Sequence, residues 1–379
     1  MNKAKVLMIQ TGGTVGQERG KDGVFRPSDK DYLDKVPGIY ELADITVKRT
    51  VNIDSTNMDT SHRAMIAELI YKNHLKYEGF VIVHGTDTMV DSAAALNYMT
   101  QNLGRPIILT GSQKSIFEHG SDAPNNLYYA VKAATMDLGE VAIAFGDKIV
   151  RGNRAIKESE HGLNAFSSPR IPPIGEIGID VMLANHRIKA YNGDPVLFTG
   201  FDTNIEFYQQ SSGTSTKIFE SYTTNEHIHG IVIGAYGAGN VQDRLVEHIA
   251  TATKNGKPVL VVTNCQLGAA DMGIYAVGSA PLEAGAISAG DMTMETATQK
   301  LMYAIGRAND AGYEGEDRLQ FITTLIHRNY AGDISAQGNR FDYMRVKEAR
   351  QRFELNSDLF HPMLDPREDE TPKEDKKKE

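Results

Sequence analysis

The chain has 379 residues, a formal net charge of −9, and ordinary globular proportions of hydrophobic (41%) and charged (23%) residues. This length predicts two or three domains. The negative charge argues against a nucleic-acid-binding protein, because no basic excess is available to neutralise phosphates. The single cysteine, Cys265, cannot form an internal disulfide, which indicates the reducing cytoplasm. It ends an apolar run that begins at Val261, so we expect it to be buried in a strand.

The sequence shows neither a secretion signal nor a membrane span. The first apolar stretch runs only from Val6 to Ile9, and no small-residue cleavage site follows it. No apolar run approaches the roughly 20 residues of a transmembrane helix. We therefore expect a cytoplasmic protein that does not contact a membrane.

The N-terminal half alternates apolar runs with segments of helical periodicity. Runs at residues 5–10, 79–83, 106–109 and 141–145 are nearly continuous, as in parallel strands covered on both faces. Residues 45–51 read as a further strand, and residues 89–103 and 125–136 as helices. This alternation predicts a doubly wound, mostly parallel α/β sheet.

The pattern restarts after a turn-rich break. Strands are predicted at residues 205–209, 230–235 and 258–262, and helices at 243–255 and 292–305. We divide the chain into an N-terminal catalytic α/β domain (1–190), a linker (191–203), a smaller C-terminal α/β domain (204–340) and an extension (341–379). The extension begins as an amphipathic helix over 341–353 and ends in a charged tail expected to be disordered.

Two segments at the carboxyl ends of predicted strands, where open α/β sheets place their sites, combine hydroxyl groups with glycine. The TGGT string at residues 11–14 presents Thr14 on a sharp turn, and its exposed amides suit an anion or oxyanion. A phosphate-binding loop or a plain turn would also fit, although the dinucleotide fingerprint is absent. The HGTDT string at 84–88 precedes a helix that Thr86, Asp87 or Thr88 could cap. Two hydroxyls around a carboxylate exceed what one cap requires.

Two further segments are more ambiguous. Residues 52–58 (NIDSTNM) suit a zwitterionic substrate, but by themselves they favour a capped turn before a helix. Residues 151–157 end in Lys157, whose amine, brought near a threonine, can favour its alkoxide or accept its proton. The default for an isolated lysine is a place at the surface.

Together these segments resemble the bacterial-type L-asparaginases, closest to their cytoplasmic type I branch. The resemblance runs from about residue 5 to about residue 305. The matching strings are TGGTVG at 11–16, DSTNM at 54–58, GFVIVHGTDTM at 79–89, LTGSQ at 109–113, RGNR at 151–154 and DMT at 291–293.

The resemblance implies catalytic roles at the matching positions. Thr14 would be the acylating nucleophile. Thr86, Lys157 and Asp87 would form a second, triad-like group, in which lysine polarises the threonine and aspartate holds the lysine. The order in which the two threonines act stays open.

It also implies how the substrate is held and converted. Ser55 and Asp87 would grip the α-carboxylate and α-ammonium of asparagine, with Thr56 and Thr86 as further contacts. Attack on the side-chain amide would release ammonia and leave an aspartyl ester, which water hydrolyses. No metal or organic cofactor is implied, and His227 and His229, which share a face of a predicted strand, lack further ligands.

The sequence departs from the family pattern in three places. Relatives carry a tyrosine on the loop after the TGGT turn, whereas Val24 or Phe25 stands here and the nearest tyrosine is Tyr32. An arginine of the allosteric site found in some type I relatives is replaced by Gly234, so we predict absent or altered regulation. The extension beyond about Gly332 does not resemble the family core.

Four other functions remain open. A glutaminase–asparaginase, or the amidase subunit of a tRNA-dependent amidotransferase, would keep the chemistry and change the substrate. The amidotransferase subunit is less favoured because it carries an extra N-terminal domain, whereas this sequence starts at the first strand. A nucleotide-binding or regulatory module would use TGGT as a phosphate cradle and bind without turnover, and the missing loop tyrosine would fit an inactive relative. From the resemblance alone we expect a homodimer or homotetramer with its sites at the interface.

Overall fold

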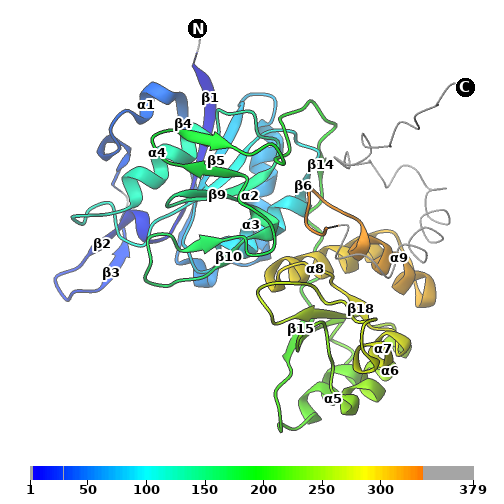
Figure 1. Ribbon diagram of the computed structural model, residues 1–379. Coiled ribbons are helices and arrows are strands. Elements are labelled where there is room, and N and C mark those ends of the chain that lie inside the picture. Colours follow the sequence, from blue (N-terminus) through cyan, green and yellow to red (C-terminus); the bar gives the residue numbers. More distant parts are fainter. Residues whose placement is uncertain (1–2, 29, 336–379) are drawn as a thin grey trace, which may run out of the picture.

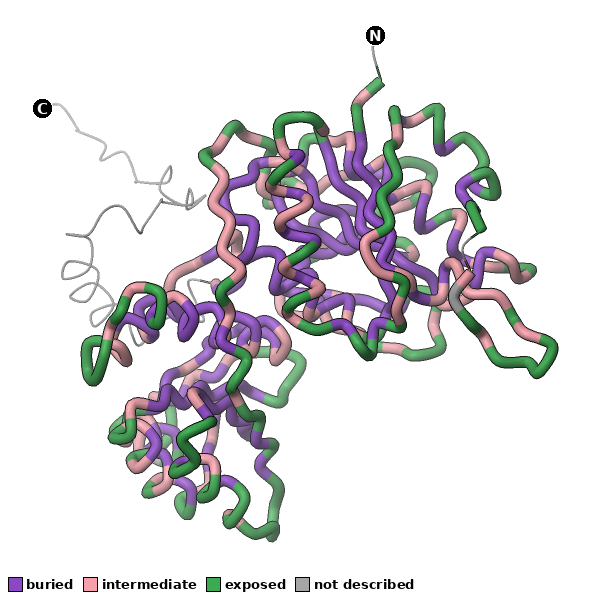
Figure 2. The backbone as a smooth tube through the Cα atoms, turned by 180° about the vertical axis from the view of Figure 1, so that it is seen from behind, coloured by how far each residue is buried: buried purple, intermediate pink, exposed green. Residues whose placement is uncertain are grey.

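The computed structural model describes residues 3–28 and 30–335. It has two lobes, each built around one parallel or mostly parallel sheet (Figure 1). In both lobes the buried residues concentrate along the inner strands and the inward sides of the helices (Figure 2). The helix predicted at 341–353 and the charged tail lie outside the described residues. Among the described residues, no helix has the length and apolar character needed to cross a membrane.

The first lobe contains an eight-stranded sheet in the order β13-β12-β9-β8-β7-β5-β1-β4, whose last five members, β8 to β4, run parallel. Its strands are β1 (Ala4–Gly12), β4 (Ala43–Ile53), β5 (Gly79–Val83), β7 (Ile107–Thr110), β8 (Val141–Phe145), β9 (Lys148–Arg151), β12 (Gly175–Ile177) and β13 (Val181–Leu183). Its helices are α1 (Ile39–Leu42), α2 (Thr60–Asn73), α3 (Met89–Met99) and α4 (Ala123–Ala133).

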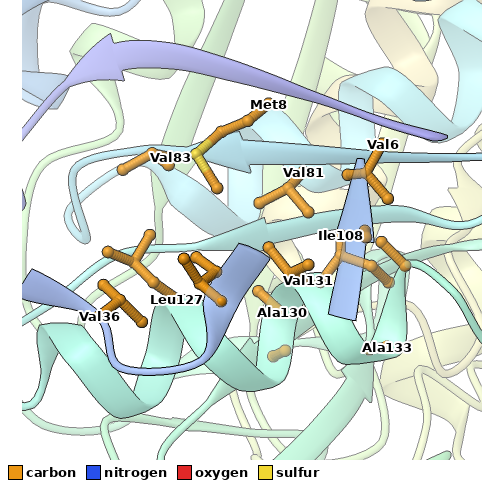
Figure 3. Close-up of a cluster of buried hydrophobic side chains, with 14 of the residues drawn as sticks. Val6, Met8, Val36, Val81, Val83, Ile108, Leu127, Ala130, Val131 and Ala133 are labelled. Atoms are coloured by element: carbon orange, nitrogen blue, oxygen red, sulfur yellow. The ribbon is translucent and has the colours of Figure 1, made fainter. Parts of the chain in front are cut away.

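Helices cover both faces of this sheet, which explains why its central strands are apolar along their length. Successive side chains of a strand point to opposite faces. Val6 and Met8 of β1 pack with Val131 of α4 on one face (Figure 3). Leu7 and Ile9 join the cluster formed with α2 and α3 on the other face. The predicted doubly wound α/β architecture is confirmed.

The edge beyond β8 differs from the parallel centre. Strands β9, β12 and β13 are antiparallel to their neighbours. They have only three or four residues each, too few to give a clear periodic pattern in the sequence.

The second lobe contains the parallel sheet β15-β16-β17-β18, which agrees with the smaller α/β unit predicted for this part of the chain. Its strands are β15 (Ile205–Gln209), β16 (Gly230–Ala235), β17 (Val259–Thr263) and β18 (Ile287–Ser288), and its helices are α5 (Lys217–Thr224), α6 (Val246–Lys254), α7 (Ala276–Glu283), α8 (Met294–Asp310) and α9 (Gly315–His327). Because β17 ends at Thr263, Cys265 is exposed, and the expectation that it is buried was wrong.

Short paired strands and 3-10 helices lie between the main strands and helices of the two lobes. They are the paired strands β2 (Gln17–Arg19) and β3 (Phe25–Pro27), β6 (Thr100–Gln101) and β14 (Val196–Leu197), and β10 (Ile156–Lys157) and β11 (Phe166–Ser167), with the 3-10 helices η1 (Thr14–Gly16), η2 (Leu33–Lys35), η3 (Ser55–Asn57), η4 (Gly152–Arg154) and η5 (Asp243–Leu245). The segment between the lobes pairs with the end of α3 through β14 and β6. Helix α3 therefore stops at Met99, earlier than the predicted residue 103.

Candidate active site

The strand order of the large sheet reverses at β1, and the predicted site residues follow the strands at this reversal. The chain passes from β1 outward to β4 and then returns to β5 on the other side of β1. In open α/β sheets, ligands bind outside the carboxyl ends of the strands at such a switch point. Thr14 follows β1, and Thr86 and Asp87 follow β5.

The turn after β1 requires two glycines. Gly12 and Gly13 have φ angles of 104° and 82°. A Cβ atom on Gly12 would lie 2.5 Å from the carbonyl oxygen of Ile53, and one on Gly13 would lie 2.5 Å from the amide nitrogen of Gly85. The Gly13 amide donates to the Ile53 carbonyl at 3.2 Å, so it is not free to bind an oxyanion. This close packing sets Thr14 directly beside the turn that follows β5.

Lys157, on β10, reaches the turn after β5 from a distant part of the sequence. Its Nζ donates to Oγ1 of Thr86 at 2.9 Å and to Oδ1 of Asp87 at 2.6 Å. The Lys157 side chain is 18% exposed and that of Asp87 is 60% exposed, so the lysine is mostly buried and the aspartate faces solvent. When Lys157 Nζ donates to the Thr86 oxygen, the hydrogen of that hydroxyl points toward another acceptor.

The segment after β4 packs against the turn after β5. Ser55 is buried, and a Cβ atom on Gly85 would lie 2.5 Å from its Oγ. Thr88 Oγ1 donates to the Ser55 carbonyl at 2.7 Å, which ties the two turns together. The Thr56 amide donates to Asp54, and this bond holds the pKa of Asp54 below its usual value. Thr56 itself is exposed beside Ser55.

A buried chain of hydrogen-bonded side chains contacts the backbone of the turn after β5 and holds it in place. Burial lowers the pKa of His84 to about 4, so its ring is neutral at pH 7. Its Nδ1 lies 2.7 Å from the Gly85 carbonyl oxygen and its Nε2 lies 2.9 Å from Ser92 Oγ. The neutral ring satisfies both contacts if Nδ1 donates and Nε2 accepts. Arg63 Nε donates to the same serine at 3.1 Å, which continues the chain and fixes the backbone just before Thr86.

Gln113 is a supporting residue for which the sequence predicted no role. Its side-chain amide donates to the carbonyls of Ser159, Glu160 and Gly162 at 3.3, 3.1 and 3.1 Å. These carbonyls belong to the loop that follows Lys157, so Gln113 holds that loop near the carboxyl end of β7. The sequence signal that could have indicated this role was the position of Gln113 at the end of the LTGSQ string.

The hairpin of β2 and β3 follows the turn that carries Thr14. Of the two residues that stand where the resemblance expects a tyrosine, Val24 is 53% exposed and Phe25 is partly buried. Tyr32 is buried instead, and a Cβ atom on Gly16 would lie 3.1 Å from its ring carbon Cε1. The nearest tyrosine therefore packs against the turn of Thr14 and does not lie on the hairpin.

The geometry thus gathers a serine, a threonine, an aspartate and a lysine beside the turn that presents a second threonine. A hydroxyl activated by a neighbouring amine, with a carboxylate that orients the amine, is the arrangement used in nucleophilic acyl transfer. Residues 5–189 match the family model described as "Asparaginase, N-terminal", and residues 204–312 match "Glutaminase/Asparaginase C-terminal domain". The chain belongs to the asparaginase family.

Individual relatives agree with this membership. The chain is 34% identical over 335 residues to the L-asparaginase of Thermococcus kodakarensis, covering 87% of this chain and 99% of that protein. It is 31% identical over 356 residues to a subunit of the glutamyl-tRNA(Gln) amidotransferase of Pyrococcus horikoshii, covering 90% and 79%. The crystal structure of L-asparaginase I from Vibrio cholerae superposes with a TM-score of 0.79 at 29% identity, covering 88% and 99%.

Proposed function

We propose that the chain is an L-asparaginase, an amidohydrolase that converts L-asparagine to L-aspartate and ammonia through a threonine acyl-enzyme. One observation carries this proposal: the Lys157 amine contacts both Thr86 and Asp87 at the switch point, beside the turn that presents Thr14. Membership of the asparaginase family and the L-asparaginase relatives support the choice of substrate.

In this proposal Thr14 attacks first. Its Oγ adds to the side-chain amide carbon of asparagine, its proton passes to Thr86 Oγ1, and the Thr86 hydroxyl proton passes to Lys157 Nζ in its neutral amine form. The resulting oxyanion needs hydrogen-bond donors, each worth about 3 kcal/mol in comparable acyl-transfer sites. The C–N bond then breaks as Lys157 returns this proton through Thr86 to the leaving nitrogen, which departs as ammonia, and water hydrolyses the aspartyl ester to free Thr14.

The remaining residues would hold the amino-acid end of the substrate. Because Lys157 contacts Oδ1 of Asp87, Oδ2 is available to accept from the α-ammonium group. Ser55, buried against Gly85, has a hydroxyl suited to the α-carboxylate. Thr86 and Thr56 are proposed as further contacts. All of these steps use the side chains of the protein and water.

The direct test is release of ammonia from asparagine in a coupled assay. We expect wild-type turnover and at least about a 1,000-fold loss of kcat in both Thr14→Ala and Thr86→Ala, as for other nucleophilic sites. Thr46→Ala, on the exposed side of β4, is a matched control that should retain wild-type activity. Full activity in Thr14→Ala and Thr86→Ala would exclude the assignment.

The main alternative keeps the chemistry but changes the substrate. One methylene separates glutamine from asparagine, and a pocket discriminates that difference by only about 1–3 kcal/mol. The relative from the glutamyl-tRNA(Gln) amidotransferase keeps a role in amide transfer open as a second candidate. Parallel turnover with asparagine and glutamine decides between them: a kcat/KM ratio above about 10 for asparagine supports the proposal.

We also propose a cytoplasmic homodimer or homotetramer. Five exposed hydrophobic side chains lie in the loops after β16 and β17 and at the start of α7, and a self-association surface would cover them. They are Tyr236, Leu267, Ile274, Tyr275 and Val277. Sedimentation velocity that gives a monomer at micromolar concentration would count against the assembly. The single cysteine supports a reducing compartment.

A further inference from the structure

The segment 330–335, which follows α9, lies between the two lobes and contacts residues of both. We infer that this segment, called the clasp below, positions Lys157 for the reaction by fixing the 3-10 helix η4 that precedes it. The inference rests on the proposed role of Lys157. It assigns a function to residues that lie beyond the C-terminal family match at 204–312.

The clasp is anchored by a fully buried carboxylate. Asp333 is 0% exposed, and its Oδ2 lies 2.7 Å from the Nζ of Lys300 on α8, which is also 0% exposed. Tyr98 of α3 donates to the same oxygen at 2.8 Å, and the Tyr330 amide donates to Oδ1 at 2.8 Å. Asp333 therefore joins a helix of the first lobe to a helix of the second. Such fully paired buried charges hold one geometry, because any displacement leaves a charge without its partner.

The backbone of the clasp is shaped to present carbonyl groups. Ala331 and Gly332 both have positive φ angles, 50° and 77°. This conformation is unfavourable for alanine and persists only where the surroundings hold it. A Cβ atom on Gly332 would overlap Nη1 of Arg151, so glycine is required there for close packing.

These carbonyls accept hydrogen bonds from two consecutive side chains of η4. Asn153 Nδ2 donates to the carbonyls of Tyr330 and Ala331 at 3.0 and 3.3 Å. Arg154 Nε donates to the Gly332 carbonyl at 2.8 Å. The clasp thus holds both of the last two residues of η4.

The second lobe holds η4 from another direction. Arg154 donates through Nη1 to the carbonyl of Asp291 at 2.7 Å and through Nη2 to its carboxylate at 3.0 Å. Thr296 Oγ1 donates to the Asn153 carbonyl at 2.8 Å. Arg154 of the RGNR string and Asp291 of the DMT string therefore form an ion pair, although they lie 137 residues apart in the sequence.

Only two residues, Ala155 and Ile156, separate Arg154 from Lys157, and Ala155 is fully buried. So short a connection leaves little freedom between the fixed η4 and the lysine. A shift of about 1 Å in a reacting group can cost about 100-fold in rate. Asn153 and Asp333 are therefore positioning residues: they touch no reacting atom and act through Lys157.

The test compares two matched asparagine-to-alanine substitutions in the full chain. Asn153 on η4 and Asn73 on α2 are both buried and both donate to a backbone carbonyl, Asn153 to Tyr330 of the clasp and Asn73 to Leu69 of its own helix at 2.7 Å. For Asn153→Ala we expect kcat to fall about tenfold with KM for asparagine within about twofold of wild type. For Asn73→Ala, which leaves the clasp and η4 intact, we expect a decrease in melting temperature but kcat within about twofold of wild type.

A readout that does not need turnover is the reactivity of Lys157. Labelling with acetyl N-hydroxysuccinimide ester, followed by mass spectrometry of the Lys157 peptide, should proceed at least threefold faster in Asn153→Ala than in wild type. Should Asn153→Ala fail to fold, Gly332→Ala disturbs η4 from the clasp side through Arg151 and should show the same decrease in kcat and the same increase in labelling.

The outcomes separate this inference from the proposed function. Wild-type kcat and wild-type labelling in a folded Asn153→Ala would overturn the role of the clasp, as would an equal loss of kcat in Asn73→Ala. A wild-type protein that does not hydrolyse asparagine would contradict the proposed function, and the labelling comparison would still report on the clasp.

Discussion

The two parallel sheets of this chain present different groups at their carboxyl ends. At the large sheet, hydroxyls, a carboxylate and an amine meet within hydrogen-bond distance. At the small sheet, amide side chains flank Gly234, and exposed apolar side chains such as Leu267 and Tyr275 follow.

The difference follows from strand order. The small sheet runs β15-β16-β17-β18 in chain order, so each connection passes to the next position on the same side. The large sheet reverses at β1, and in open α/β sheets ligands bind outside the carboxyl ends of the strands at such a switch point. The comparison teaches that strand order decides which of the polar loops after parallel strands is a candidate site.

The largest expected difference comes from one substitution made at both sheets. Thr86→Val, after β5, should lower kcat at least about 1,000-fold with little change in melting temperature, because it removes the hydroxyl that Lys157 contacts. Thr263→Val, at the end of β17, should leave kcat within about threefold. It should cost about 1 kcal/mol of stability, because Thr263 donates to the Gly237 carbonyl. Ammonia release and urea unfolding measure the two quantities. An equal loss of kcat in Thr86→Val and Thr263→Val would contradict the proposal that only the large sheet carries the active site.

A second comparison uses glycines at positive φ in the two regions. Gly13→Ala places a Cβ atom 2.5 Å from the Gly85 amide nitrogen and should reduce activity at least about 100-fold while destabilising the fold by about 2–4 kcal/mol. At Gly237, where φ is 47°, the nearest atom to such a Cβ is 3.5 Å away. Gly237→Ala should therefore cost only about 1 kcal/mol. Chemical denaturation with activity assays on both variants tests this ranking. A milder effect at Gly13 would mean that the turn can relax.

A third test concerns the buried support of the large-sheet site. Burial lowers the pKa of His84 to about 4 in the folded protein, whereas in the unfolded chain its pKa is near the ordinary value of 6.5. The unfolded chain therefore binds a proton more readily, so acid favours unfolding. The stability that the neutral ring contributes is fully present above pH 6.5 and falls as the pH decreases toward 4, by up to about 3 kcal/mol. Urea unfolding at pH 7 and pH 5 should show a smaller pH-dependent loss for His84→Asn than for wild type. An equal loss of stability between pH 7 and pH 5 in wild type and His84→Asn would show that His84 is not the cause of the pH dependence.

The smallest expected effect concerns regulation at the second lobe. A Cβ atom on Gly234 would lie 2.5 Å from Oε1 of Gln209 and 2.7 Å from Oδ1 of Asn264, so an arginine side chain at this position would displace both. We therefore predict hyperbolic asparagine saturation, with a Hill coefficient of about 1 and no coupling between sites. Initial rates over a roughly 100-fold range of asparagine concentration measure this, and a sigmoidal curve would show that coupling survives without the arginine.

Much of the fold could be predicted because buried strands are apolar on both faces. Strands β5, β8 and β16 begin and end where their apolar runs do. The antiparallel edge β9-β12-β13 and helix α9 were not predicted. The edge strands are too short to show a period, and α9 mixes acidic and apolar residues without a glycine or proline stop at its end.

The candidate site was predicted as separate segments, and their roles stay predictions. Motif strings indicated Thr14, Thr86, Asp87 and Lys157, but no local pattern states that Lys157 Nζ lies 2.9 Å from Thr86. The supporting residues were less visible. Gln113 and the chain of Arg63, Ser92 and His84 act through contacts that join distant parts of the sequence, and these do not leave a periodic signal.

By itself the sequence determined the central parallel strands of both sheets and the glycine turns after them, because burial on two faces and positive φ angles restrict the residue types locally. Tertiary structure alone decided the strand order that places the switch point at β1 and the contact of Lys157 with Thr86 and Asp87. It also decided the meeting of Arg154, Asp291 and the clasp between the lobes. These contacts join residues 70 to 178 positions apart. Their geometry depends on how whole sheets and helices pack, which no local pattern encodes.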